Sequence, residues 1–187
     1  KKHMDRELFL IDLRKYWIEN TVPNISDVNA KFLVDLIKIS KTKNMLEIWT
    51  ANWFSGINFA IELEKNNGHL TTIDFSPKSQ GEALVNFKIA KVDHIITSIL
   101  WNALDEIPKL QDDFFDFIFI DGMKKRSADF LNLCLPKAKS GAIIIIDDVL
   151  KFSDKMPTLW LYLEENKIKY NILPIDPDDG ILMMIKD

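Results

Sequence analysis

Short apolar segments alternate with longer amphipathic segments along most of this chain. Apolar runs rich in β-branched and aromatic residues favour strands, and segments with apolar positions every three or four residues favour helices. The pattern predicts strands at 45–50, 70–75, 95–100, 115–120, 142–147, 170–175 and 181–186. It predicts helices at 5–19, 27–40, 55–65, 77–90, 103–109, 126–135 and 156–166, with Ser26 as the N-cap of the second helix.

This order of elements predicts an α/β fold: a doubly wound, Rossmann-like sheet of seven strands, mostly parallel, with helices on both faces. The strands at 115–120 and 142–147 are almost continuously apolar, as expected where helices cover both faces of a sheet. Only residues 174–180, which include two prolines, separate the last two strands. This connection is too short for a crossover helix, so we expect the final strand to run antiparallel.

The length of 187 residues suits one domain over 1–187, with N-terminal helices in 1–40 and the sheet in 43–187. The formal net charge of −4 gives no general attraction to nucleic acid or to an anionic membrane. Cys134 is the single cysteine and the three histidines are far apart, which excludes an internal disulfide and a Cys/His zinc cluster. No apolar run is long enough to cross a bilayer. We therefore expect a cytoplasmic protein with no membrane partner.

The turn after the first predicted strand is the first place to look for a ligand, because open α/β sheets bind ligands beyond the carboxyl ends of their strands. Residues 46–56 of this turn read LEIWTANWFSG. About twenty residues after Trp53, the second strand ends at Asp74, where a carboxylate can hold a ribose diol. An equally good interpretation is that Asp74 only caps the helix that begins near Pro77.

The chain resembles the cation-dependent O-methyltransferases that use S-adenosylmethionine, which include catechol and caffeoyl-coenzyme A methyltransferases and their bacterial relatives. The resemblance runs from about Asp27 to the C-terminus. The family's first turn reads Leu-Glu-Ile-Gly-Thr-x-x-Gly-Tyr/Phe-Ser, which Glu47, Thr50, Phe54 and Ser55 match. The resemblance implies the strand order 3-2-1-4-5-7-6 and a cofactor site formed by Glu47, Trp49, Thr50, Trp53, Ser55, Asp74, Phe75, Trp101, Asn102, Ala103 and Asp121.

Tryptophan stands at three positions where the family has glycine, namely Trp49, Trp53 and Trp101. Glycine permits left-handed backbone angles and close approach of a cofactor, and tryptophan permits neither readily. A single tryptophan is usually an ordinary core or stacking residue, but three at such positions favour another interpretation. We expect the three rings to fill or narrow the S-adenosylmethionine pocket, either by deliberate substitution in an engineered variant or by natural loss of activity.

Three carboxylates follow the fourth and fifth predicted strands: Asp121, Asp147 and Asp148. Adjacent parallel strands bring them to one edge of the sheet, where they repel one another unless a cation or protons intervene. Oxygen ligands suit Mg²⁺, Mn²⁺ or Ca²⁺, so a metal site is predicted, although such aspartates can also cap helices. The family's metal ligands are two aspartates and an asparagine, and Asp148 replaces the asparagine.

Lys124 follows Asp121 at the position of the family's catalytic lysine, which implies that it accepts or stabilises the proton of the acceptor hydroxyl. The alternative is that residues 124–126 are a solvated basic start to a helix. The predicted function is metal-assisted O-methylation of a small hydroxylated substrate.

Other functions stay open at this point. With Lys137 and Lys139, residues 124–126 could form a local patch for tRNA, whose wobble hydroxyuridine is another substrate of the family. A non-enzymatic protein that keeps the scaffold is the competing class. The apolar strand at 181–185 is a candidate homodimer surface.

Overall fold

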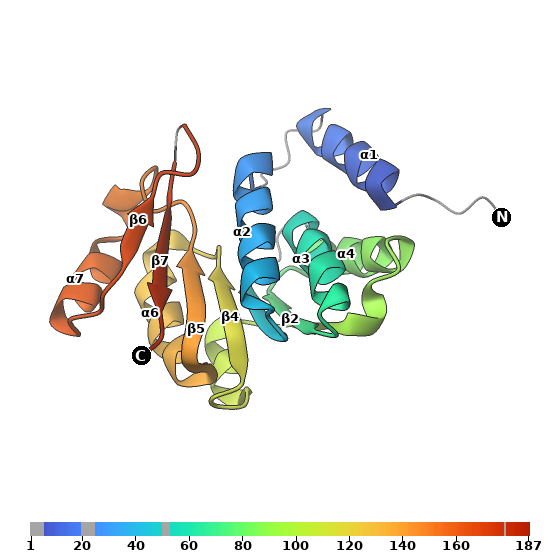
Figure 1. Cartoon of the computed structure of the whole chain (residues 1–187). Coiled ribbons are helices and arrows are strands. Elements are labelled where there is room, and N and C mark those ends of the chain that lie inside the picture. The colour runs from blue at the N-terminus through green and yellow to red at the C-terminus, as the bar shows by residue number, and fades with distance from the viewer. Residues whose placement is uncertain (1–5, 20–24, 50–52, 178) are drawn as a thin grey trace.

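A seven-stranded sheet runs through the described part of the chain, which in this computed structural model comprises residues 6–19, 25–49, 53–177 and 179–187 (Figure 1). Its strands are β1 (Asn44–Ile48), β2 (His69–Asp74), β3 (Ile96–Leu100), β4 (Phe115–Ile120), β5 (Ala138–Ile146), β6 (Asn171–Leu173) and β7 (Ile181–Ile185). The strand order is β3-β2-β1-β4-β5-β7-β6; β1 to β5 pair in parallel, and β7 pairs antiparallel with β5 and β6. The predicted fold class and strand order are confirmed.

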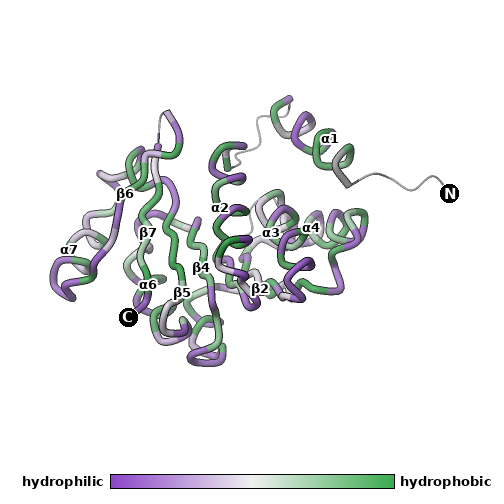
Figure 2. The backbone as a smooth tube through the Cα atoms, in the orientation of Figure 1, coloured by the Kyte–Doolittle hydropathy of each residue, from purple (hydrophilic) through white to green (hydrophobic). Residues whose placement is uncertain are grey.

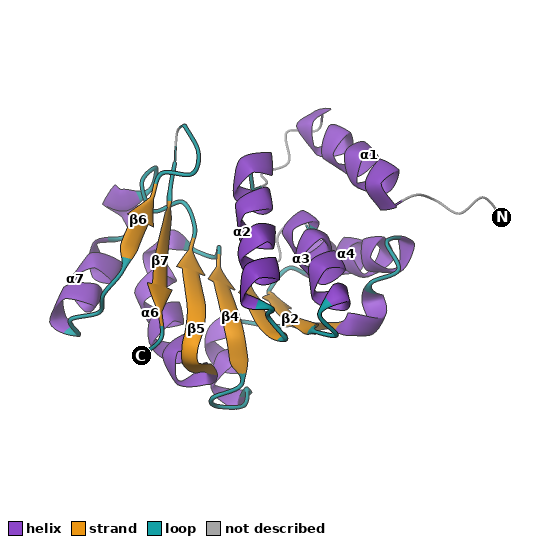
Figure 3. Cartoon of the chain, in the orientation of Figure 1, coloured by secondary structure: helices purple, strands orange, loops and turns teal. Residues whose placement is uncertain are grey.

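Helices cover both faces of this sheet (Figure 3). They are α1 (Arg6–Glu19), α2 (Asp27–Ser40), α3 (Phe54–Lys65), α4 (Pro77–Ile89), α5 (Ala103–Glu106), α6 (Ser127–Cys134) and α7 (Pro157–Glu165). One buried cluster joins α2, α3 and α4 to the sheet, and a second joins α5, α6 and α7 to the opposite face. Helix α1 contacts α3 and lies farther from the strands (Figure 1).

Strand β4 shows why the central strands are apolar at nearly every position. Phe117 and Phe119 belong to the cluster under α2 and α3, whereas Ile118 and Ile120 belong to the cluster under α6 and α7. Successive side chains of a strand point to opposite faces, and here both faces are covered. The tube of β4 is accordingly green along most of its length in Figure 2, Asp116 being its polar residue.

Several element boundaries differ from the prediction, for local reasons. The expected strand at 170–175 is reduced to Asn171–Leu173, because Pro174 has no N–H to donate to a strand ladder. Strand β5 begins at Ala138 rather than Ala142; its pairing with β4 contains a register shift, and Gly141 has a φ of 81°. The Ser26 cap is confirmed, since its Oγ accepts a hydrogen bond from the Asn29 N–H at 3.0 Å.

Most of the apolar sequence of strand β7 serves the core of this chain. The strand is hydrogen-bonded on both sides, to β5 and to β6, and Ile181, Leu182 and Met184 are buried. Ile185, at the end of the strand, is 52% exposed, so the dimer surface stays a prediction. Among the described residues, no helix is long and apolar enough to cross a membrane.

Candidate functional site

The loops at the carboxyl ends of β1 to β5 begin at fixed positions, because their first residues continue the sheet's hydrogen bonding. The Trp49 N–H donates to the Ile73 carbonyl at 2.8 Å, and the Asp121 N–H donates to the Ile48 carbonyl at 3.1 Å. Trp101 is held in the same way on the end of β2. Residues from four parallel strands are thus brought to one edge of the sheet, as the sequence predicts for its candidate site.

Trp49 has the backbone conformation that glycine normally supplies. Its φ is 80°, in the left-handed region that costs a residue with a β-carbon about 1–2 kcal/mol. Its ring centroid lies 4.5 Å from that of Phe75, at an interplanar angle of 51°. On its other side the ring faces Gly122, where a β-carbon would lie 3.5 Å from Trp49 Cε3. The indole therefore occupies space between the ends of β2 and β4, directly beyond β1.

Trp53 also has a left-handed backbone, with φ of 54°, but its ring goes elsewhere. The side chain is only 5% exposed, and its Nε1–H donates to the Ser79 carbonyl of α4 at 2.9 Å. The ring packs in the core cluster under α2 and α3. Our expectation that Trp53 fills the same pocket as Trp49 is not met, because the ring finds a hydrogen-bond acceptor and apolar neighbours on the α4 side.

A cavity of about 410 Å³ lies beside Trp49. It is lined by Trp49, Ile73, Phe75, Trp101, Asn102, Ala103, Leu104, Met123, Arg126 and Phe130. Trp101 is 61% exposed, and its φ lies outside the left-handed region. It therefore stands at the rim of the cavity and, unlike Trp49, does not need glycine-like backbone angles.

Glu47 and Ser55 form a buried pair below this cavity rather than part of its lining. The Ser55 hydroxyl donates to Glu47 Oε1 at 2.6 Å, and the Thr72 hydroxyl donates to Oε2 at 2.9 Å. Burial raises the pKa of Glu47 to about 7, against the opposing effect of these two hydrogen bonds. The pair joins the start of α3 to β1 and β2, so its evident role is to fix the turn that carries Trp49.

Asp74 is buried and holds the next turn. Its Oδ1 accepts the Ser76 N–H at 2.7 Å. The N-cap of α4 is Ser76, whose Oγ accepts the Ser79 N–H, so the alternative interpretation of Asp74 as the cap of this helix is wrong.

Asn102 caps the short α5 by accepting the Leu104 N–H at 3.1 Å. Thr50 lies outside the described residues.

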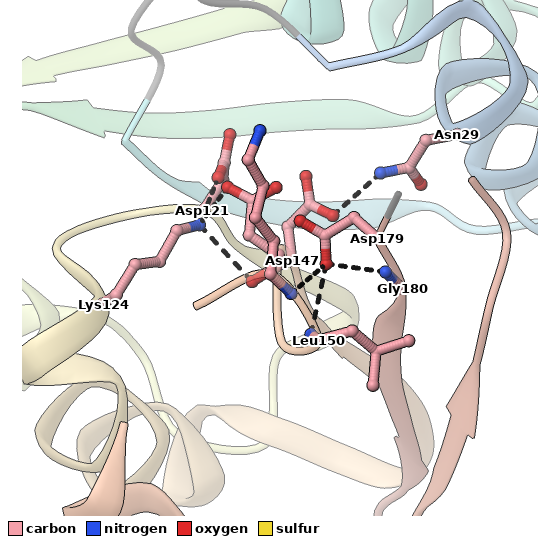
Figure 4. A network of polar contacts seen from close by, with 9 residues as sticks. Asn29, Asp121, Lys124, Asp147, Leu150, Asp179 and Gly180 are labelled. Atoms are coloured by element: carbon pink, nitrogen blue, oxygen red, sulfur yellow. Dashed lines mark hydrogen bonds and ion pairs between the residues drawn. The ribbon is translucent and has the colours of Figure 1, made fainter. Parts of the chain in front are cut away.

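The three predicted carboxylates, Asp121, Asp147 and Asp148, come together at the ends of β4 and β5. Each offers an oxygen within 4.8 Å of the others. Lys124 Nζ lies 2.9 Å from Asp121 Oδ1 and 2.8 Å from Asp148 Oδ2 (Figure 4). Asp148 has a φ of 59°, a conformation that aspartate and asparagine tolerate better than most residues.

The electrostatics of this cluster favour a positive charge at its centre. Burial, followed by the charges of Asp121 and Asp148, raises the pKa of Asp147 well above its ordinary value. Although burial opposes it, the charges of Asp121 and Asp148 hold the pKa of Lys124 above its ordinary value. Clustered carboxylate oxygens in a buried position suit a hard divalent cation such as Mg²⁺, Mn²⁺ or Ca²⁺. The residues present therefore fit the predicted kind of ion.

Comparison with known proteins identifies the family. A family model described as O-methyltransferase matches residues 2–157. The chain belongs to this O-methyltransferase family. The catechol O-methyltransferase of Mycobacterium tuberculosis is 31% identical over 127 residues, which are 68% of this chain and 57% of that protein. The probable caffeoyl-CoA O-methyltransferase 3 of Dictyostelium discoideum is 30% identical over 149 residues, 75% of this chain and 59% of that protein.

The chain thus aligns with less than two thirds of the length of these curated relatives. The fold of this chain is also similar to that of solved structures. The O-methyltransferase of Bacillus cereus in complex with SAH has a TM-score of 0.84 and 22% identity, covering 96% of this chain and 90% of that one. The predicted family resemblance is confirmed.

Two polar residues next to the acidic cluster, Asn29 and Asp179, were not predicted from the sequence. Asn29 of α2 donates from Nδ2 to Asp147 Oδ1 at 2.8 Å. Asp179, before β7, accepts the N–H groups of Leu150 and Lys151 through Oδ1, at 3.1 and 3.0 Å. The sequence contains a signal for Asn29 alone: it falls on the apolar stripe of α2, where a polar residue needs a reason.

Lys124, Lys137 and Lys139, which were considered for tRNA, do not form one patch. Lys137 is buried at the opposite end of the sheet, where its Nζ contacts Asp112 at 2.6 Å. Lys139 is paired with Asp116 there, at 2.8 Å. Lys124 is engaged by the acidic cluster. Their geometry therefore gives no support to a nucleic-acid surface made from these lysines.

Proposed function

We propose that this chain is an O-methyltransferase that transfers a methyl group from S-adenosylmethionine to a hydroxyl of a small substrate, with help from a divalent cation. One observation carries the proposal: Asp121, Asp147 and Asp148 meet around Lys124 at the carboxyl ends of β4 and β5. In a chain of this family, that cluster is suited to hold an ion next to the acceptor oxygen.

The residues of the cluster have separable roles in this proposal. Asp121, Asp147 and Asp148 would supply oxygen ligands, and a bound cation would lower the pKa of an acceptor hydroxyl. Lys124 is the proposed catalytic residue: its Nζ, fixed by Asp121 and Asp148, would stabilise the acceptor oxyanion as an ammonium group, because its raised pKa keeps it protonated. Asp121 Oδ1 and Asp148 Oδ2 hold this ammonium group in place, so no large rearrangement is needed to present it.

The donor side of the site would use the cavity beside Trp49. Asp74 at the end of β2 would bind the ribose of the donor, while Phe75, Trp101, Asn102, Ala103 and Asp121 would contact the rest of the molecule. The donor supplies the methyl group as a sulfonium, so the protein needs only to align it with the acceptor oxygen and to exclude water. Glu47 and Ser55 would act indirectly, by fixing the turn after β1.

We further propose that Trp49 weakens binding of S-adenosylmethionine. Its indole lies between Phe75 and Gly122, across the path from the ends of β2 to the acidic cluster. A cofactor that reaches from Asp74 to the cluster must displace this ring. The packing of the ring against Phe75 opposes that displacement, because an aromatic contact of this kind contributes about 0.5–1.5 kcal/mol beyond area burial.

Calorimetric titration with S-adenosylhomocysteine tests the donor side. We expect weak binding by the natural sequence and a gain of about tenfold or more for Trp49→Gly, equivalent to at least about 1.4 kcal/mol. Trp53→Gly is the matched control, because it also replaces a left-handed tryptophan but one whose ring points to α4. Micromolar binding by the unchanged chain, with no gain in Trp49→Gly, would contradict the proposed blockage.

Methyl transfer to a catechol in the presence of Mn²⁺ tests the acceptor side. The Trp49→Gly variant is the appropriate enzyme for this assay, and Trp49→Gly combined with Asp147→Asn is its inactive control. Activity that survives chelation of divalent ions would refute the cation's role. Binding of S-adenosylhomocysteine without turnover of any hydroxylated acceptor would instead favour the non-enzymatic class.

A further inference from the structure

Helix α2 places one buried amide against the acidic cluster. Asn29 is 3% exposed, and its Nδ2 lies 2.8 Å from Asp147 Oδ1 (Figure 4). The same side of α2 carries Leu33 and Ile37, which are fully buried against the sheet. Asn29 is therefore a polar residue within the apolar stripe that docks the helix.

Stability alone does not account for an asparagine at this position. Its Oδ1 is buried and has no hydrogen-bond partner among the described residues. A buried amide oxygen without a partner costs free energy that an apolar side chain of similar size would not cost. The hydrogen bond to Asp147 is the feature that only the polar side chain can provide.

That hydrogen bond restrains Asp147 directly. A carboxylate turns easily about its last side-chain bond, and a donor fixed on one oxygen sets the direction of the other. Asp147 is the most buried of the three carboxylates, and besides Asn29 the backbone of Asp148 also acts on it. The orientation of its oxygens toward Asp121 and Asp148 thus depends in part on where Asn29 is held.

Asn29 is itself held through Ser26. The Asn29 backbone N–H donates a hydrogen bond to Ser26 Oγ, the N-cap of α2, at 3.0 Å. The Ser26 hydroxyl in turn donates to Asp176 Oδ1 at 2.6 Å. Asp176 lies in the connection between β6 and β7, which also carries Asp179. Asp179 in turn accepts N–H groups of the loop that follows Asp148. The first turn of α2 and the loop after β5 are therefore linked through a third segment.

We propose that Asn29 is a positioning residue of the cation site, which orients Asp147 for ion binding from outside the set of ligands. The inference rests on the cation site of the proposed function. It extends that site from the strand ends to the N-terminal helix α2. Substitution of a residue that orients a metal ligand through a hydrogen bond typically lowers metal affinity by about 10–100-fold, which corresponds to about 1.4–2.7 kcal/mol.

The test measures Mn²⁺ affinity by calorimetry, with the free ion followed by electron paramagnetic resonance. Asn29→Leu keeps the size of the side chain and removes the donor, and Asn29→Ala keeps the helix if leucine prevents folding. The matched control is Asn58→Leu, because Asn58 of α3 donates to the Phe54 carbonyl at 2.7 Å and, within the described part of the chain, has no hydrogen bond to the cluster. The thermal midpoint of each variant is recorded without metal.

We expect both Asn29 variants to bind Mn²⁺ about 10–100-fold more weakly than the natural sequence and Asn58→Leu to bind it equally well. In the natural chain, Mn²⁺ should also slow amide hydrogen exchange in the first turn of α2, and in Asn29→Ala it should not. Unchanged affinity in a folded Asn29 variant would overturn the inference, and so would an equal loss in Asn58→Leu. Failure of the natural chain to bind Mn²⁺ would overturn the cation site itself, and with it this role.

Discussion

The ring centroids of Trp49 and Phe75 lie 4.5 Å apart, on residues that follow the adjacent strands β1 and β2. Both rings line the cavity beside the carboxyl edge of the sheet. A φ of 80° is usually adopted by glycine, and here the residue that adopts it carries an indole. The same edge keeps its acidic cluster, which makes the two halves of the site separately testable.

The two left-handed tryptophans should differ in their contribution to stability. Trp53→Gly removes a buried ring and its hydrogen bond to Ser79, and relief of backbone strain offsets only part of this loss; we expect destabilisation of about 2–4 kcal/mol. Trp49→Gly removes a half-buried ring, and its strain relief should keep the change within about 1 kcal/mol. Urea denaturation followed by circular dichroism measures both. Equal losses would show that the Trp49 ring stabilises the fold as much as the Trp53 ring.

Glu47 should make stability depend on pH. Its pKa is raised from 4.5 to about 7 in the folded chain, so between these values the folded state holds a proton that the unfolded state releases. The free energy of unfolding should then fall as pH rises through this window and level off above it. Glu47→Gln removes this contribution, so its stability relative to the natural chain should rise by up to about 3 kcal/mol between about pH 4.5 and pH 8.

Urea midpoints of both proteins across that range provide the measurement. The comparison uses the difference between the two proteins, since other groups titrate equally in both. A difference that does not change with pH would contradict the raised pKa of Glu47.

Asp147→Asn should have opposite effects with and without metal. Removing one of three clustered charges relieves repulsion, so the metal-free protein should become more stable by about 1 kcal/mol. Added Mn²⁺ should raise the thermal midpoint of the natural chain and leave that of the variant unchanged, because a ligand that binds only the folded state stabilises it. Equal Mn²⁺ shifts in the two proteins would place the ion elsewhere.

Lys124→Met should destabilise the chain, because it leaves Asp121 and Asp148 without their ammonium partner. We expect a loss of about 2–4 kcal/mol at about pH 8, and a smaller loss at about pH 5, where the carboxylates are more easily protonated. Added Mn²⁺ should recover part of the loss by supplying positive charge. Thermal melts at the two pH values give the result.

Lys139→Met is the control for this change. Lys139 is paired with Asp116 at the other end of the sheet, and both side chains are more exposed than Lys124. Its removal should cost less than about 1 kcal/mol and should not respond to Mn²⁺. A Lys124 variant that behaves in the same way would show that the ion pairs of the cluster contribute little.

The sequence by itself determined the sheet, its reversed last strand and the place of the acidic cluster. The hydrophobic periods of about 2 residues in strands and about 3.6 in helices depend on local chain geometry, and the nearly continuous apolar sequence of β4 indicates that both its faces are covered. Parallel strands must end at one edge, so Asp121, Asp147 and Asp148 had to meet there once the strand order was known.

Only the tertiary structure decided where the side chains of the site point. Trp49 and Trp53 have the same kind of backbone angle, yet one ring enters the cavity and the other packs on α4, because the Ser79 carbonyl is within reach of Trp53 alone. Asn29 and Asp147 are 118 positions apart and meet only when α2 docks on the sheet. Contacts between distant segments depend on the packing of the whole chain, which no local pattern contains.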